Sequence, residues 1–229
     1  MTESKAAAAQ PSATNRDITD RLLYPLLLRL VVFIPPSVHP NTITLAALGS
    51  ALAAAAALAF WSSPFALLAC AAGLVGWVLL DACDGIHARN TGQCSKFGSF
   101  LDHFGDATGF FFLQAAIIYR FDIHEPVVFG AMLLRQVMVC WTYIIQVYAG
   151  HLYIASLGWS FEIYAYATLM VATFLVPALR FQVGFFPRLD LLGNAMLIYY
   201  VAVPLTLLEI GMAIYSAQKK ALRDSKQEN

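Results

Sequence analysis

The chain has 229 residues, of which 59% are hydrophobic and only 12% are charged, whereas about 25% of residues in soluble domains carry a charge. This composition excludes an ordinary soluble domain and predicts an integral membrane protein. The formal net charge is zero, so the charge balance gives no indication of a nucleic-acid partner. The four cysteines are scattered and form neither a metal-ligand pair nor a disulfide framework.

The beginning of the chain predicts a tail followed by a helix at the membrane surface. Residues 1–16 are polar and alanine-rich and lack the apolar core of a secretory signal, so we expect a flexible tail. Residues 17–34 place leucines on one helical stripe and arginines opposite, which predicts an amphipathic helix lying in the membrane interface. Asp17 or Thr19 would cap this helix, and a pair of prolines ends it.

Six later segments are apolar and have about 20 residues or more, which is enough to span a bilayer as helices. Pro40 opens the first of them, with Asn41 as the expected N-cap. The predicted spans are residues 42–61, 64–89, 97–120, 125–149, 160–181 and 190–216. We therefore predict an all-α integral membrane protein with one membrane-embedded domain, residues 17–218, and a polar C-terminal tail, residues 219–229.

Lysine and arginine are distributed unequally between the two sides that these spans define. Ten of them precede the first span, connect the second to the third or follow the last, and three lie on the opposite side. Positive residues concentrate on the cytoplasmic side of membrane proteins. The sequence thus predicts that both termini and the connection between the second and third spans face the cytoplasm. The membrane would be the endoplasmic reticulum or a related endomembrane in a eukaryote and the inner membrane in a bacterium.

Four aspartates inside apolar spans are the most informative feature. Asp81 and Asp84 are three positions apart, and Asp102 and Asp106 four, so each pair shares a helical face. An acid at the centre of a membrane helix costs about 2.5–3.5 kcal/mol. A bound divalent cation would offset this cost, because Mg2+ takes carboxylate oxygens as ligands and bridges them to substrate phosphates. The two pairs lie about 7 to 15 Å from the cytoplasmic ends of two antiparallel helices, so they can meet in one cavity.

Residues suited to phosphate binding lie beside these acids. Gly85 directly follows Asp84, and Gly98 comes four positions before Asp102. The missing Cβ lets a bulky anionic group approach the helix backbone at both glycines. Arg89 lies one turn after Gly85, and its guanidinium group suits bidentate phosphate contact. The pattern predicts a site for a diphosphate substrate held against two metal ions.

The same stretch resembles the CDP-alcohol phosphotransferase family. The family pattern D-x2-D-G-x2-A-R-x8-G-x3-D-x3-D is met at every fixed position, by Asp81, Asp84, Gly85, Ala88, Arg89, Gly98, Asp102 and Asp106. The resemblance covers residues 40–120, and the family fold agrees with six spans and an N-terminal interfacial helix. It implies transfer of a phosphoalcohol group from a CDP-linked donor to an alcohol acceptor, with release of CMP and with a lipid as at least one substrate.

The resemblance also implies roles for individual residues. Asp81, Asp84 and Asp102 would be ligands of two Mg2+ or Mn2+ ions, and Asp106 would act both as a ligand and as the catalytic general base. The CDP moiety would be contacted by five residues, which are Asn41, Thr44, Gly85, Arg89 and Ser95. A homodimer is expected from the resemblance alone.

Two subfamilies fit the motif. The sequence Asp102-His103-x-x-Asp106 is similar to the D-H-x-x-D variant of choline and ethanolamine phosphotransferases, which use CDP-aminoalcohols and diacylglycerol. His103 would then either assist proton transfer or serve as a polar packing residue. The compact length and residues 91–98 look more like phosphatidylinositol synthases, which use CDP-diacylglycerol. We favour the first interpretation and keep the second as the alternative.

Several observations leave other interpretations open. Carboxylates in a helix bundle also mark ion-translocating proteins, although the offset of these acids to one leaflet favours an enzyme over a divalent-cation transporter. Arg135 lies within a predicted span and requires a partner or a phosphate, while Glu162 is expected to face the lipid headgroups. Gly105 and Gly109 suit either a dimer contact or a tight helix crossing within one chain.

Overall fold

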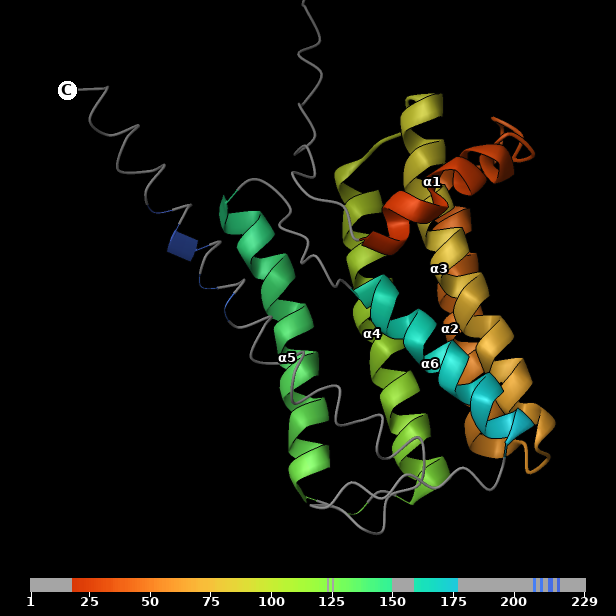
Figure 1. The fold of residues 1–229 in the computed structure, drawn as a ribbon. Coiled ribbons are helices and arrows are strands. Elements are labelled where there is room, and N and C mark those ends of the chain that lie inside the picture. The colour runs from red at the N-terminus through yellow and green to blue at the C-terminus, as the bar shows by residue number, and fades with distance from the viewer. Residues whose placement is uncertain are drawn as a thin grey trace, which may run out of the picture.

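The structure is a computed structural model that describes residues 18–122, 124, 126–149 and 159–176, together with residues 208, 211, 214, 215 and 218. The helices in this part of the chain are α1 (Ile18–Val31), α2 (Pro40–Phe60), α3 (Phe65–Thr91), α4 (Lys96–Phe121), α5 (Pro126–Ala149) and α6 (Trp159–Leu175). No strand occurs among the described residues (Figure 1). The all-α prediction is therefore confirmed.

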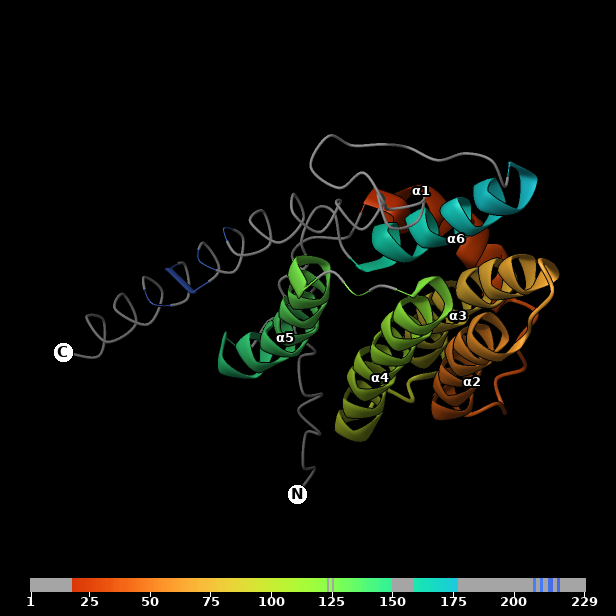
Figure 2. The same ribbon diagram turned by 90° about the horizontal axis from the view of Figure 1, so that it is seen from below.

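Helices α2, α3 and α4 lie side by side and share one hydrophobic core (Figures 1 and 2). The short connections between them make each helix antiparallel to the next. The core is centred on fully buried side chains from all three helices, including Leu58, Leu74, Trp77, Leu113 and Ile117. Helix α5 packs beside α4, while α6 and α1 pack against α3. The two helices that carry the four aspartates, α3 and α4, thus both pack against α2 in the centre of the bundle.

Small residues bring these helices unusually close together. A Cβ added to Gly109 of α4 would lie 2.9 Å from both the Cβ of Ala51 in α2 and the ring of Trp77 in α3. A Cβ added to Gly73 of α3 would lie 2.8 Å from the Cβ of Ala54. Only residues without a side chain allow such approach of helix backbones. Of the two roles considered for Gly109, the structure shows the tight crossing within one chain.

The ends of the central helices follow local capping chemistry. Helix α2 begins at Pro40, and the Nδ1 atom of His39 accepts a hydrogen bond from the backbone N–H of Asn41 at 3.2 Å. The prediction that Asn41 is the N-cap is wrong, because Pro40 already occupies the first helical position, where its missing N–H costs nothing. Helix α3 ends at Thr91 and is capped by Gly92, whose φ of +67° favours glycine. Ser95 caps α4 by accepting a hydrogen bond from the N–H of Gly98 at 2.9 Å.

Helix α1 is attached to the bundle by one apolar face. Leu27 and Val31 are buried against Cys83 and Ile86 of α3. The large apolar side chains Val32 and Phe33, which follow the helix, are exposed. Thr19 lies inside α1 rather than at its start, so it is not the N-cap, and Asp17 lies outside the described residues.

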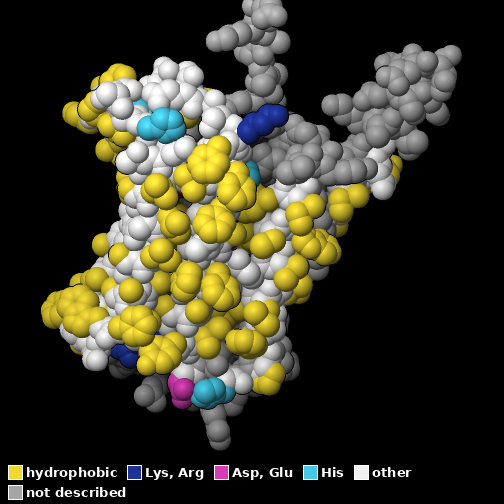
Figure 3. Space-filling view, turned by 180° about the vertical axis from the view of Figure 1, so that it is seen from behind, with side chains coloured by type: hydrophobic (Ala, Val, Ile, Leu, Met, Phe, Trp, Pro, Cys, Tyr) yellow, Lys and Arg dark blue, Asp and Glu magenta, His cyan; other side chains and the backbone are white. Residues whose placement is uncertain are grey.

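The lengths of the helices agree with a membrane protein. By length and composition, α2 and α3 are able to cross a bilayer, and α5 and α6 contain shorter apolar helical segments. Hydrophobic side chains cover the middle of the face in Figure 3, and charged side chains gather near its two ends. The bounds of the first four predicted segments match helices α2 to α5 to within two residues at each end, although only α2 and α3 qualify as candidate spans among the described residues. The end of the fifth and nearly all of the sixth lie outside the described residues, so six spans remain a prediction.

Candidate active site

Three of the four aspartates converge between α3 and α4. One carboxylate oxygen from each of Asp81, Asp102 and Asp106 lies within 4.8 Å of the other two. Asp106 is buried, and the other two side chains are half-buried. The i, i+4 spacing places both α4 carboxylates on the face that meets Asp81 of α3. The structure therefore brings together a compact set of carboxylates that comes from two neighbouring helices.

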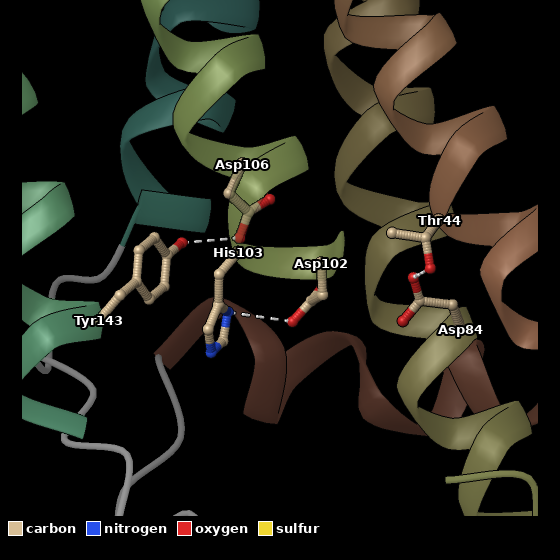
Figure 4. Close-up of polar contacts among 6 residues, drawn as sticks. All are labelled: Thr44, Asp84, Asp102, His103, Asp106 and Tyr143. Carbon is tan, nitrogen blue, oxygen red and sulfur yellow. Dashed lines mark hydrogen bonds and ion pairs between the residues drawn. The ribbon is translucent and has the colours of Figure 1, made fainter. Parts of the chain in front are cut away.

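Asp84 lies to one side of this group. It is buried, and its Oδ2 atom accepts a hydrogen bond from the hydroxyl of Thr44 in α2. Figure 4 shows the Thr44–Asp84 pair on the α2 and α3 side, apart from Asp102, His103 and Asp106 on α4. Asp84 was expected to be a metal ligand and Thr44 a nucleotide contact. In the structure these two residues are hydrogen-bonded to each other. Because Thr44 belongs to α2, this helix orients the Asp84 carboxylate.

The residues expected to bind the cytidine diphosphate fall into two small groups near the connection between α3 and α4. A guanidinium nitrogen of Arg89 lies 3.3 Å from the position that a Cβ on Gly85 would take, so this cation covers the exposed helix backbone. The Oδ1 atom of Asn41 and the Oγ atom of Ser95 each lie 3.1 Å from the corresponding position on Gly98. Asn41 and Ser95 thus meet at the first turn of α4, where backbone N–H groups favour an anion.

Two side chains beside the carboxylates complete a polar network. The Nδ1 atom of His103 lies 3.3 Å from Oδ2 of Asp102. Tyr143 of α5 donates a hydrogen bond to Oδ2 of Asp106 at 3.0 Å (Figure 4). Tyr143 lies outside the sequence motif, and the sequence does not indicate its contact with the acids. No spacing rule could reveal this contact, because Tyr143 lies 37 residues away on another helix.

The carboxylate group is chemically suited to a divalent cation. Three carboxylates so close together repel one another, and a bound cation removes this repulsion. The Oδ1 atom of Asp106 is buried and has no hydrogen-bond partner among the described residues, so it is free to act as a ligand. An all-oxygen donor set favours hard ions such as Mg2+ or Mn2+ over softer metals. The residues therefore fit a metal site of the kind that the sequence predicts.

The segment between α1 and α2 is attached to the end of α3 beside this site. His87 is buried, and its Nε2 atom lies 2.8 Å from the carbonyl oxygen of Val38. Gln93 donates a hydrogen bond to the carbonyl oxygen of Pro36 at 3.1 Å. Sequence reasoning found no role for His87. The structure shows that it holds the segment that leads into Asn41.

A buried ion pair connects α5 to α6. The Nη2 and Nε atoms of Arg135 lie 2.8 and 2.9 Å from Oε2 of Glu162. Arg135 thus has the partner that its position requires. The expectation that Glu162 faces the lipid headgroups is wrong, because its side chain is buried against α5, where it neutralises the arginine.

In this all-helical chain, carboxylates from two consecutive helices lie beside an arginine, an arrangement that suits an enzyme acting on phosphate esters. The chain belongs to the CDP-alcohol phosphatidyltransferase family, whose family model matches residues 37–208. This match extends beyond α2–α4 to the later helices.

Among the curated proteins, the chain is similar to cholinephosphotransferase 1 of Mus musculus and of Rattus norvegicus. Each is 37% identical over 109 residues, which cover 44% of this chain and 27% of the relative. Cholinephosphotransferase 1 of Bos taurus is 36% identical over 111 residues with the same coverage. The aligned region thus spans little more than a quarter of the length of these relatives. The predicted relation to the choline and ethanolamine branch of the family is confirmed.

Proposed function

We propose that the protein transfers a phosphoalcohol group from a CDP-alcohol to a hydroxyl acceptor and releases CMP. The observation that supports this most directly is the convergence of Asp81, Asp102 and Asp106 within 4.8 Å, in a chain whose family acts on CDP-alcohols. The nearby Gly85 and Arg89 suit a diphosphate, because the guanidinium covers backbone that no side chain shields. Such an arrangement holds a charged substrate next to acids that would otherwise repel it.

The proposed reaction is a displacement at the phosphorus atom that carries the alcohol. The oxygen of the acceptor hydroxyl forms a new bond to this phosphorus, the bond from phosphorus to the bridging oxygen breaks, and CMP leaves with both electrons of that bond. The acceptor proton passes to a general base on the protein. When bound, Mg2+ or Mn2+ ions, two per site by family resemblance, neutralise the pyrophosphate and stabilise the charge on the leaving oxygen. Their ligands would be Asp81, Asp84, Asp102 and Asp106.

The base is proposed to be Asp106, with assistance from His103. Oδ1 of Asp106 and Nε2 of His103 are both buried and have no hydrogen-bond partner within the described part of the chain. Each atom is therefore available to an incoming hydroxyl group. The Nδ1 atom of His103 lies 3.3 Å from Oδ2 of Asp102, which favours the tautomer with its hydrogen on Nδ1. In this tautomer Nε2 is the nitrogen that accepts the proton. The cytidine diphosphate would be held by Asn41, Thr44, Gly85, Arg89 and Ser95. Of these, Thr44 would act through Asp84.

The donor is proposed to be CDP-choline or CDP-ethanolamine and the acceptor diacylglycerol. The supporting observations are the similarity to proteins named cholinephosphotransferase 1 and the Asp102-His103-x-x-Asp106 sequence. We also propose that six helices span the membrane, that the site opens to the cytoplasm and that the protein is a homodimer. Helix α1 is proposed to lie in the membrane interface. The exposed Val32 and Phe33, which follow α1, support the placement of this helix, since they would enter the lipid.

The experiment that tests this function uses the purified full-length chain in lipid nanodiscs. Labelled CDP-choline, CDP-ethanolamine or CDP-diacylglycerol is supplied with diacylglycerol or inositol, and both CMP and the lipid product are identified. We expect an aminoalcohol phospholipid with Mg2+ or Mn2+ and no product after chelation. A product from CDP-diacylglycerol and inositol would assign the phosphatidylinositol-synthase alternative. Metal uptake by vesicles without CMP release from any donor would instead show a cation transporter.

A further inference from the structure

Tyr143 of α5 contacts two functional side chains of α4 at once. Its hydroxyl donates to Oδ2 of Asp106 at 3.0 Å. Its ring stacks on the imidazole of His103, with 4.1 Å between the ring centroids and 13° between the planes. Figure 4 shows the two rings face to face, with the hydroxyl directed at the carboxylate. A single residue from outside the sequence motif therefore touches both groups of the proposed proton acceptor.

The hydrogen bond makes the two oxygens of Asp106 different. Oδ2 accepts from Tyr143, whereas Oδ1 is buried and has no hydrogen-bond partner among the described residues. The terminal torsion of an aspartate side chain is intrinsically broad, so a carboxylate without a fixed donor can rotate and exchange its two oxygens. The tyrosine hydroxyl stops this exchange and leaves Oδ1 as the oxygen presented to a cation or to a hydroxyl group.

The stacking has a similar effect on His103. Its Nδ1 atom lies 3.3 Å from Oδ2 of Asp102, which fixes one edge of the ring, while the parallel ring of Tyr143 fixes its plane. The remaining nitrogen, Nε2, is buried and has no hydrogen-bond partner in the described part of the chain. Tyr143 thus determines the direction of both atoms that could receive the acceptor proton.

We propose that Tyr143 is a positioning residue of this site, which reserves Oδ1 of Asp106 for the metal ion or the acceptor and holds His103 in plane. The turnover measurement that tests this proposal rests on the proposed function, whereas the metal-binding measurement does not. A packing role alone would be served equally well by phenylalanine, because the ring is unchanged. The hydroxyl group is therefore the part of Tyr143 on which the test depends.

The test compares Tyr143→Phe with the wild-type chain in nanodiscs, using Tyr119→Phe as the matched control because Tyr119 is an exposed residue toward the far end of α4. Mn2+ binding is measured by electron paramagnetic resonance without substrate, and CMP release gives kcat and KM. Loss of an outer-shell partner typically costs about ten- to hundredfold in metal affinity or activity. We expect Tyr143→Phe to raise the Mn2+ dissociation constant or lower kcat by about tenfold or more, with KM for the donor and the melting temperature retained.

A second variant isolates the ring. Tyr143→Leu removes the stacking as well as the hydroxyl, so we expect a further two- to tenfold loss of kcat, about the value of one aromatic pair. This additional loss should disappear when both variants are made in a His103→Ala background.

Wild-type Mn2+ affinity together with wild-type kcat in Tyr143→Phe would overturn the proposal. A loss that is accompanied by a matching fall in melting temperature would also overturn it. If the wild-type chain shows no turnover but Tyr143→Phe still weakens Mn2+ binding, the proposed function fails while the positioning role stands.

Discussion

The hydroxyl of Thr44 donates a hydrogen bond to the buried carboxylate of Asp84, although 40 residues separate them and they belong to different helices. Asp84 is thus hydrogen-bonded outside the group that Asp81, Asp102 and Asp106 form. This bond couples the start of α2, where Asn41 lies, to the helix that carries Gly85 and Arg89. This side-chain contact therefore links the two sides of the proposed nucleotide site, in addition to the hydrogen bonds of His87 and Gln93 to the segment before α2.

Replacement of Thr44 by valine should leave Asp84 without this donor while the shape of the side chain is preserved. Because a hydrogen bond to a charged group contributes about 1.5–3 kcal/mol, we expect the free energy of unfolding in mixed micelles to fall by that amount. CMP release should decrease as well, because the carboxylate is no longer oriented. Thr44→Ser keeps the hydroxyl and should restore most of both quantities. Equal behaviour of the valine and serine variants would show that the bond has no role.

Asp106→Asn should abolish turnover and leave donor binding largely intact. The amide cannot accept the acceptor proton as a carboxylate does, and loss of a general base typically costs about 10²- to 10⁴-fold. The measurements are CMP release and equilibrium binding of the labelled CDP donor. Asp122→Asn is the matched control, because Asp122 is exposed beyond the other end of α4 and its φ of +53° suits asparagine. Turnover that survives in Asp106→Asn would remove this residue from the base role.

Removal of one member of the buried pair Arg135–Glu162 should be more harmful than removal of both. Arg135→Met leaves the glutamate buried without its partner, which typically costs about 3–5 kcal/mol of stability. The double variant with Glu162→Gln leaves no isolated charge, so much of this loss should be recovered. Chemical unfolding of the two single variants and the double variant measures the coupling. Additive losses would indicate that the two side chains do not interact in the membrane.

Gly109→Ala tests the close crossing of α2, α3 and α4. The new Cβ would lie 2.9 Å from both Ala51 and Trp77, so the helices must separate, and overpacking of this kind costs about 1–3 kcal/mol. Gly49→Ala in α2 is the control, because nothing lies within 4 Å of the added atom. There we expect unchanged stability or a gain of up to about 1 kcal/mol from better helix propensity. Equal melting temperatures for the two variants would contradict the crossing.

The features that the sequence predicts well are those in which neighbours along the chain act on one another. The bounds of α2 to α5 follow from apolar length and from prolines and glycines, and the faces shared by Asp81 and Asp84 or by Asp102 and Asp106 follow from 3.6 residues per turn. The motif from Asp81 to Asp106 identifies the family because its fixed residues have fixed spacings along two consecutive helices.

Contacts between distant helices depend instead on how each helix is rotated and tilted against its neighbours, which periodicity along one segment does not encode. For this reason the sequence does not predict the contact of Tyr143 with Asp106, the burial of Glu162 against Arg135, or the separation of Asp84 from the other three aspartates. By itself, the sequence determined the membrane class, the helices and the chemistry of the acids. Only the tertiary structure decided which carboxylate oxygens accept a hydrogen bond and which have no partner in the described part of the chain, because each of these bonds joins side chains from different helices.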